Sequence, residues 1–224
     1  MNKHDVISAM ELSALAYQQE QPQITRQQLT ILDDTVTGVQ CYLRQWGDCL
    51  TIIFRGTDSA QDWDTDFAFG KKEVPYGNTE SPIRVHGGFL DAYKAPTVRN
   101  RIHKFITPHV HKVRITGHSY GAALAVLCSV DLQFNFPEKD YEVFLFGCPR
   151  VGNKAFQQSY NNRIFKALRI ENGNDIVTKM PPKMLGFHHV GIPIHVGARR
   201  RPFVFSFRDH NTQEYYANLF MQLP

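Results

Sequence analysis

Long apolar runs are missing from this sequence. No segment approaches the roughly 18 consecutive apolar residues that a membrane-spanning helix requires, although 42% of the residues are hydrophobic. Residues 1–17 mix charges into a helical pattern and lack the unbroken apolar core of a signal peptide, so we expect them to form the first helix of the fold. The sequence predicts no transmembrane segment, and a location in the cytoplasm or export without a cleavable signal.

Cysteine is also scarce, and the net charge is small. The four cysteines, at positions 41, 49, 128 and 148, lie in apolar settings without metal-ligand spacing, so we expect buried free thiols rather than a disulfide scaffold. The 25 Lys and Arg against 21 Asp and Glu are too scattered to favour a nucleic acid partner. One basic run, Arg199 to Arg201, is interpreted as a solvated loop, with phosphate or lipid head groups as its alternative contact.

Seven short runs rich in β-branched and aromatic residues are the predicted strands. Residues 45–48 between the first two runs indicate a hairpin, whereas helix-length segments separate later runs. This order predicts one α/β domain over residues 1–224, with a mixed, mostly parallel sheet and helices on both faces. The runs are 39–44, 50–54, 113–116, 143–146, 165–170, 189–196 and 203–207.

A serine between two glycines interrupts the most apolar part of the chain. The stretch ITGHSYGAALA, residues 115–125, turns a predicted strand directly into a predicted helix at Ser119. So sharp a turn crowds neighbouring side chains, and Gly117 and Gly121 relieve that crowding. The pattern predicts a nucleophile presented at a helix N-terminus. The alternative is a structural turn with an idle serine.

A serine nucleophile needs a histidine base and a carboxylate that orients the base. In the GxSxG arrangement the partners follow in the order acid, then histidine. Asp175 is the later aspartate that directly follows a predicted strand at the edge where ligands collect. His210, in a polar loop before a final helix, is the predicted base, with His189 as second candidate; His118 is interpreted as a packing residue.

Acyl transfer also needs hydrogen-bond donors aimed at the developing oxyanion. Tyr120, directly after the serine, supplies a backbone N–H at the helix N-terminus. The loop after the strand at 50–54 supplies the second, and the Thr57 hydroxyl is a further donor. Thr57 and Tyr120 are therefore the predicted oxyanion hole.

With these residues assigned, the chain resembles the class 3 lipases, an α/β-hydrolase family. By position, the resemblance gives Ser119, Asp175 and His210 the triad roles, and Thr57 and Tyr120 the oxyanion hole. Ala122 and Thr178 depart from the usual glycine and proline; we expect Thr178 to loosen the loop that carries Asp175. The segments that carry the likeness are IIFRGTDSAQDWDTDFAF, VHGGFLDAY, ITGHSYGAALA, FLFGCPRVGN, NGNDIVTKMPP, HHVG and DHNTQEYY.

The resemblance also implies a short helical lid in the segment SAQDWDTDFAFGKKE. Trp63 and Phe67 are four residues apart and would share one helical face. That apolar stripe is narrow, and the acidic residues Asp62, Asp64 and Asp66 would be repelled by anionic lipid. We therefore expect weak interfacial activation, against the alternative of an ordinary amphipathic surface helix.

Other patterns are assigned structural roles. His109 and His111 stand two residues apart without a third ligand nearby, so no metal site is predicted. His86 is expected to bridge loops near the site. Alternating aromatics are assigned to the buried core: Phe144, Phe146, Phe203 and Phe205.

Together these features predict a serine carboxylic-ester hydrolase that needs no cofactor and acts through an acyl-enzyme. The favoured substrate is a glycerolipid ester, possibly met at a lipid–water interface, and we expect a monomer. Phospholipase A1, feruloyl-type esterase and acyltransferase remain alternatives among enzymes. A catalytically silent lipid-binding module is the alternative outside enzymes.

Overall fold

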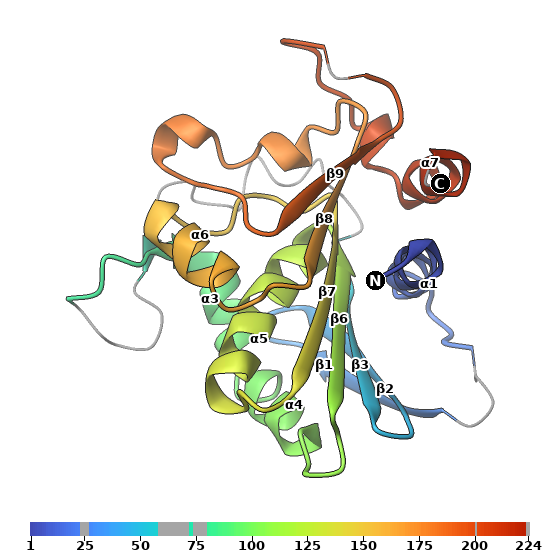
Figure 1. The fold of residues 1–224 in the computed structure, drawn as a ribbon, viewed down its shortest axis with the longest axis vertical. Helices are drawn as coiled ribbons and strands as arrows, with labels where there is room; N and C mark the ends of the chain where they lie inside the picture. The colour runs from blue at the N-terminus through green and yellow to red at the C-terminus, as the bar shows by residue number, and fades with distance from the viewer. Residues whose placement is uncertain (23–26, 58–71, 74–79, 200, 223–224) are drawn as a thin grey trace.

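A computed structural model describes residues 1–22, 27–57, 72–73, 80–199 and 201–222 of the chain (Figure 1). Its main sheet has seven strands in the order β1-β2-β3-β6-β7-β8-β9. Strands β1 to β3 pair antiparallel, and every pair from β3 onward is parallel. A hairpin followed by crossovers therefore builds the mixed, mostly parallel sheet that the sequence predicts. The strand bounds are β1 Gln28–Asp34, β2 Val39–Trp46, β3 Cys49–Phe54, β6 Lys112–His118, β7 Asp140–Phe146, β8 Ala167–Asn172 and β9 Ile192–Val196.

Helices cover both faces of this sheet, as in an α/β-hydrolase fold. Helices α1 (Lys3–Leu15) and α7 (Thr212–Gln222) pack side by side on one face (Figure 1). The opposite face carries α3 (Gly87–Lys94), α4 (Arg99–Phe105), α5 (Tyr120–Asn135) and α6 (Lys154–Asn161). A two-stranded sheet of β4 (Lys72–Glu73) and β5 (Val85–His86) precedes α3.

The core lies between α5 and the central strands β6 and β7. Almost every residue of α5 is buried, which explains why its sequence is apolar on all sides rather than on one stripe. The side chains of Val113, Ile115, Val143 and Leu145 in β6 and β7 are also fully buried. Burial on both faces of the sheet accounts for the continuous apolar run Val143 to Phe146 in β7, which lacks polar alternation.

The N-terminal segment forms α1 as predicted. Asn2 and Asp5 exchange side-chain to backbone hydrogen bonds of 3.0 and 2.9 Å, a capping box that begins the helix. Val6, Ala9 and Met10 pack into a second apolar cluster with Tyr215 and other residues behind β7 and β8. Among the described residues, no helix is both long enough and apolar enough to cross a membrane.

The predicted strand at 203–207 is wrong. This segment is irregular, and its β-pairing within the described residues is an isolated bridge between Ser206 and Asp175. Phe203 and Phe205, assigned to the core from their alternation, are 93% and 58% exposed, whereas Phe144 and Phe146 are buried as predicted. The sheet already ends at β9, so the alternating aromatics have no strand to pair with.

Candidate active site

Ser119 lies at the tip of a strained turn between β6 and α5. Its backbone angles are φ 60° and ψ −127°, a region that residues with side chains rarely occupy. A Cβ atom on Gly117 would stand 2.5 Å from the carbonyl carbon of Gly121, and one on Gly121 would stand 2.3 Å from the Phe54 carbonyl oxygen. Glycine is therefore needed at both positions, because a side chain would collide with the backbone of the neighbouring segment.

The structure brings the three predicted triad residues into one hydrogen-bonded line. The Ser119 Oγ lies 2.8 Å from His210 Nε2, and His210 Nδ1 lies 2.8 Å from Asp175 Oδ2. Because a carboxylate only accepts, Nδ1 carries the ring proton and Nε2 accepts from the serine hydroxyl. All three side chains are buried. The arrangement can pass a proton from serine to imidazole.

Asp175 is held by three donors. Its Oδ2 also accepts a 2.6 Å hydrogen bond from the Tyr215 hydroxyl, and its Oδ1 accepts the Val177 amide at 2.8 Å. Burial and the neighbouring carboxylate raise the pKa of Tyr215 well above its ordinary value, so the phenol stays protonated and donates. The sequence analysis did not identify Tyr215, because it lies on α7, far along the chain from Asp175.

His210 sits on a 3₁₀ turn (Arg208–His210) against Gly147. Gly147 follows β7 at φ +57°, and a Cβ there would stand 2.9 Å from His210 Cε1 and 3.1 Å from Asp175 Oδ2. The missing side chain leaves room for the histidine–carboxylate pair. This residue lies in the quoted segment FLFGCPRVGN, but no role in the site was predicted for it.

His118 contacts the predicted base from behind. Its ring packs against that of His210 at a tilt of 32°, with centroids 4.5 Å apart, and its Nε2 donates to the His210 carbonyl oxygen at 2.8 Å. Tyr17, just beyond α1, lies 2.8 Å from Nδ1 of the same ring. Burial and the neighbouring His210 lower the pKa of His118 well below its ordinary value, so no positive charge opposes protonation of His210. The predicted packing role of His118 is therefore incomplete, because its ring also hydrogen-bonds the backbone of His210.

The predicted oxyanion residues lie on two sides of the serine. Tyr120 begins α5, and its backbone N–H belongs to the first turn of that helix. Thr57 follows β3 and lines a cavity of about 320 Å³ together with Tyr17, His118 and His210. A Cβ on the adjacent Gly56 would stand 2.7 Å from the His118 carbonyl oxygen, so this loop passes close behind the turn at Ser119.

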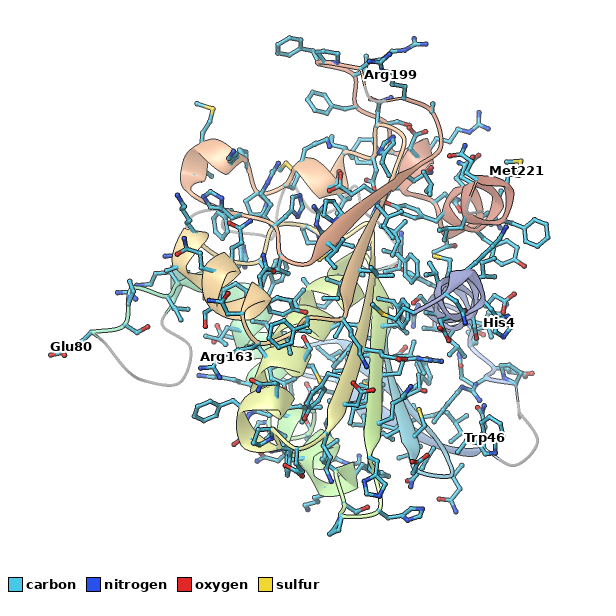
Figure 2. The ribbon with its side chains drawn as sticks, viewed as in Figure 1. His4, Trp46, Glu80, Arg163, Arg199 and Met221 are labelled. Carbon is cyan, nitrogen blue, oxygen red and sulfur yellow. The ribbon has the colours of Figure 1, made fainter. Side chains whose placement is uncertain are left out.

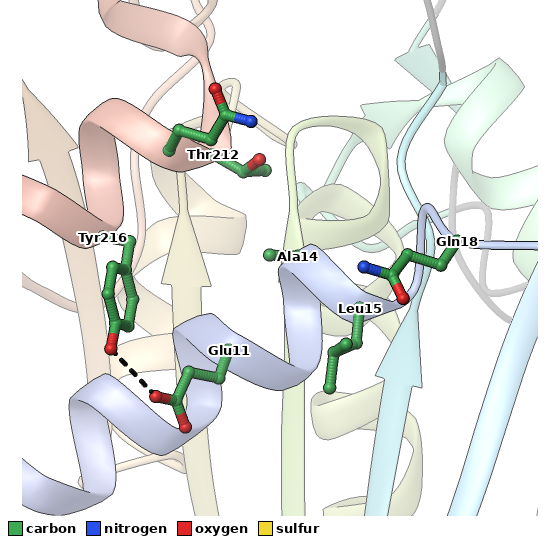
Figure 3. A pocket seen from close by; sticks show the side chains of 7 residues that line it. Glu11, Ala14, Leu15, Gln18, Thr212 and Tyr216 are labelled. Atoms are coloured by element: carbon green, nitrogen blue, oxygen red, sulfur yellow. Dashed lines mark hydrogen bonds between the residues drawn. The ribbon is translucent and has the colours of Figure 1, made fainter. Parts of the chain in front are cut away.

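A second cavity of about 460 Å³ lies between α1 and α7 (Figure 3). Glu11 and Tyr216 close one side of it through a 3.1 Å hydrogen bond. Thr212 and Gln213 line both cavities, so the two hollows are neighbours. The cavity between α1 and α7 therefore adjoins the cavity beside His210.

The remaining sequence candidates lie elsewhere. His189 Nε2 donates a 2.8 Å hydrogen bond to the Thr178 carbonyl oxygen, and burial lowers the pKa of His189 to about 3. His86 packs between Phe89 and Phe187, with ring centroids 4.4 and 6.0 Å away, which agrees with a structural role. Cys41, Cys128 and Cys148 are buried free thiols as predicted, whereas the free thiol Cys49, at the start of β3, is only partly buried. Within the described residues, His, Cys, Asp and Glu do not gather into a group that would hold a metal ion.

The family follows from comparison with known proteins. A family model described as "Lipase (class 3)" matches residues 51–185, which is more than half of the chain. The chain belongs to the class 3 lipase family.

This class 3 lipase chain is similar to proteins from fungi and plants. It is 36% identical to a lipase of Rhizomucor miehei over 146 residues, 62% of this chain and 39% of the relative. A chloroplastic phospholipase A(1) of Arabidopsis thaliana is 32% identical over 153 residues, 61% of this chain and 34% of the relative. The chain therefore spans less than half the length of these curated relatives.

The solved structures agree with the fold. A triacylglycerol lipase whose catalytic centre is formed by a serine protease triad superposes with a TM-score of 0.71 at 26% identity. The superposition covers 87% of this chain and 79% of that one. The lid that the resemblance implies, with Trp63 and Phe67, lies outside the described residues. Its weak role in interfacial activation therefore stays a prediction.

One departure from the family pattern turns out differently from its prediction. Thr178 was expected to loosen the loop that carries Asp175. Instead its side chain is buried, and its hydroxyl donates a 2.8 Å hydrogen bond to the Asp175 carbonyl oxygen. The threonine thus supplies a hydrogen bond that proline could not make. Ala122 is fully buried in α5.

Proposed function

We propose that this class 3 lipase hydrolyses carboxylic esters of glycerolipids through an acyl-enzyme intermediate. Ser119 is the nucleophile, His210 the general base and acid, and Asp175 the group that orients His210. Thr57 and Tyr120 hold the oxyanion. The observation that supports these roles most directly is the position of the His210 ring, 2.8 Å from both its serine and its carboxylate partner.

The geometry suggests how the steps would follow one another. Ser119 Oγ attacks the ester carbonyl while its proton passes to His210 Nε2, and Asp175 stabilises the imidazolium that forms. His210 then returns the proton to the departing alcohol, leaving the acyl group on the serine. Water attacks the acyl carbonyl as His210 takes its proton; the bond between the acyl group and Ser119 Oγ then breaks, the fatty acid leaves, and His210 returns the proton to Oγ. Backbone donors at the start of α5 stabilise both tetrahedral intermediates.

Hydrolysis of p-nitrophenyl esters from acetate to palmitate tests this proposal. We expect turnover by the wild-type chain and a loss of at least about 1,000-fold in kcat for Ser119→Ala, because the nucleophile is removed. Ser129→Ala is the matched control, since Ser129 is also buried but its hydroxyl bonds to Val126 of α5 and to Tyr160, neither of which belongs to the triad. Equal rates for wild type and Ser119→Ala would instead favour the catalytically silent lipid-binding module.

Phospholipase A1 activity is the second candidate, supported by the named activity of the Arabidopsis relative. Trioleoylglycerol and dioleoyl phosphatidylcholine, offered separately, distinguish the two. Release of the sn-1 acyl chain from the phospholipid at a higher kcat/KM would make phospholipase A1 the better description. Adding glycerol or methanol as competing acceptors would reveal an acyltransferase through new ester products.

A further inference from the structure

The loop at residues 197–208, described at 197–199 and 201–208, exposes aromatic side chains at the catalytic edge of the sheet. Phe203, Phe205 and Phe207 are 93%, 58% and 48% exposed, and Val204 is 44% exposed. The loop projects beyond the strand ends at the top of Figure 1, and Figure 2 labels Arg199 there. Exposed side chains of this size lose contact with water only if another surface covers them.

The outward charge of this loop is positive. Arg199 and Arg201 are exposed, and within the described part of the chain neither forms an ion pair. Arg208 pairs with Glu214 at 2.9 Å, which offsets its charge. Asp209, next to the loop, turns inward, where its Oδ2 accepts the Asn174 amide at 2.7 Å. Aromatic and basic side chains therefore occur together on the outer side of the loop.

The base of the loop is fastened to the segment that carries Asp175. The Arg201 amide donates to Asn174 Oδ1 at 2.8 Å, and the Ser206 amide donates to the Asn174 carbonyl oxygen at 2.9 Å. Phe203 has φ +61°, and among the described non-glycine residues Ser119 is its counterpart with positive φ. Phe203 therefore has a strained backbone although its side chain is 93% exposed and is not held by the protein core.

We propose that the loop at 197–208 docks the protein on an anionic lipid surface. Arg199 and Arg201 contact phosphate groups, while Phe203 and Phe205 enter the boundary between head groups and acyl chains. This inference rests on the proposed function, because a hydrolase of insoluble esters must reach them at a lipid surface. The loop's fastening to the Asp175 segment would then hold the site at that surface.

Charge and shape favour lipid over a protein partner. Anionic lipids attract each arginine near the surface with about 1 kcal/mol, roughly a five-fold gain in binding. A projecting tip with separate aromatic side chains suits insertion, whereas protein interfaces of comparable strength bury about 800 Å² of packed surface on each partner. A protein partner remains an outcome of the test below.

Vesicle co-sedimentation tests the proposal with the Ser119→Ala chain, which cannot consume the lipid if the proposed function holds. The vesicles contain phosphatidylcholine alone or with about 30 mol% phosphatidylglycerol, an anionic content that gives a negative surface potential. We expect binding at least about ten-fold tighter to the anionic vesicles, and a loss of that preference in high salt.

Substitutions in the loop separate its two contributions. Arg199→Gln with Arg201→Gln should abolish the preference for anionic vesicles, and Phe203→Ser with Phe205→Ser should weaken binding to anionic vesicles about ten-fold or more. The matched controls are Arg163→Gln and Phe165→Ser, in the turn between α6 and β8, where Phe165 is 76% exposed; Figure 2 labels Arg163 well away from Arg199. Both controls should bind vesicles like the unsubstituted chain.

Two further measurements make the result decisive. Hydrogen–deuterium exchange can be measured on the chain without loop substitutions. Anionic vesicles should slow amide exchange at residues 201–207 and leave the exchange rates at 163–165 unchanged. Unchanged vesicle binding in both loop variants, or no binding to either vesicle, would overturn the proposal and leave a protein partner. Wild-type turnover of soluble p-nitrophenyl butyrate without vesicles tests the proposed function separately, so either proposal can fail alone.

Discussion

The absence of a side chain at Gly147 shapes the site as much as the triad residues do. A methyl group there would meet the ring of His210 and the carboxylate of Asp175 at once. Rates in such sites depend steeply on position, and a displacement of about 1 Å costs on the order of 100-fold.

We therefore predict that Gly147→Ala lowers kcat/KM about 100-fold, because it pushes His210 away from Ser119. Steady-state hydrolysis of p-nitrophenyl butyrate measures the change. Gly38→Ala is the control: Gly38 also has positive φ, at +70°, but a Cβ there meets nothing within 4 Å. If both variants lost activity equally, backbone strain rather than contact with the histidine would explain the loss.

Sequence reasoning placed Ser119, Asp175 and His210 because each follows from local pattern, strand order and chain order. Tyr17, Gly147 and Tyr215 were not assigned roles, because their contacts join segments far apart in the chain and no local pattern marks them. The alternation of Phe203 and Phe205 was misread as a buried strand. Alternation indicates a strand only when a partner strand is available, and pairing partners cannot be read from one segment.

At the scale of secondary-structure elements, Asp131 links three helices. On α5, its carboxylate accepts from Tyr93 of α3 at 2.6 Å and from Arg99 of α4 at 2.9 Å, and His103 of α4 lies 2.7 Å away. Burial raises the pKa of Asp131, but the hydrogen bonds from His103, Arg99 and Tyr93 outweigh it and lower the pKa to about 2. The charged form thus stabilises the packing of α3, α4 and α5.

We predict that Asp131→Asn lowers the free energy of unfolding by about 2 kcal/mol at pH 7, or the melting temperature by about 4–8 °C. The folded pKa lies below the unfolded value of about 3.9, so this contribution is present above pH 4 and is lost as pH falls toward 2. Urea unfolding at pH 7 and pH 3 should therefore show a smaller difference between the two proteins at pH 3.

Asp140→Asn is the control for that measurement. Asp140 pairs with Lys166 at 2.7 Å, but both side chains are nearly half exposed. Surface pairs of this kind contribute about 0–1 kcal/mol. A loss for Asp131→Asn as small as that for Asp140→Asn would contradict the structural role of the buried carboxylate.

At the scale of the whole molecule, approach to lipid and catalysis are assigned to different segments. The acidic residues of the predicted lid would be repelled by anionic lipid, whereas Arg199 and Arg201 of the loop at 197–208 would be attracted. We expect the protein to work as a monomer, because Ser119, His210 and Asp175 of a single chain complete the triad. Light scattering during gel filtration should then give a mass near 25.7 kDa.

We predict weak interfacial activation. As a short-chain ester passes from solution into emulsion, its rate of hydrolysis should rise no more than several-fold, since the predicted lid has a narrow apolar stripe. Initial rates on either side of the solubility limit measure the ratio. A sharper jump would assign the lid a larger role than its sequence indicates.

Contacts from both ends of the described chain complete the site: Tyr17, after the first helix, reaches His118, and Tyr215, on the last one, reaches Asp175. A ribosome therefore has to release the chain through α7, which carries Tyr215, before these contacts can form together. The nascent protein would stay inactive until that moment, which would spare the lipids around it during synthesis.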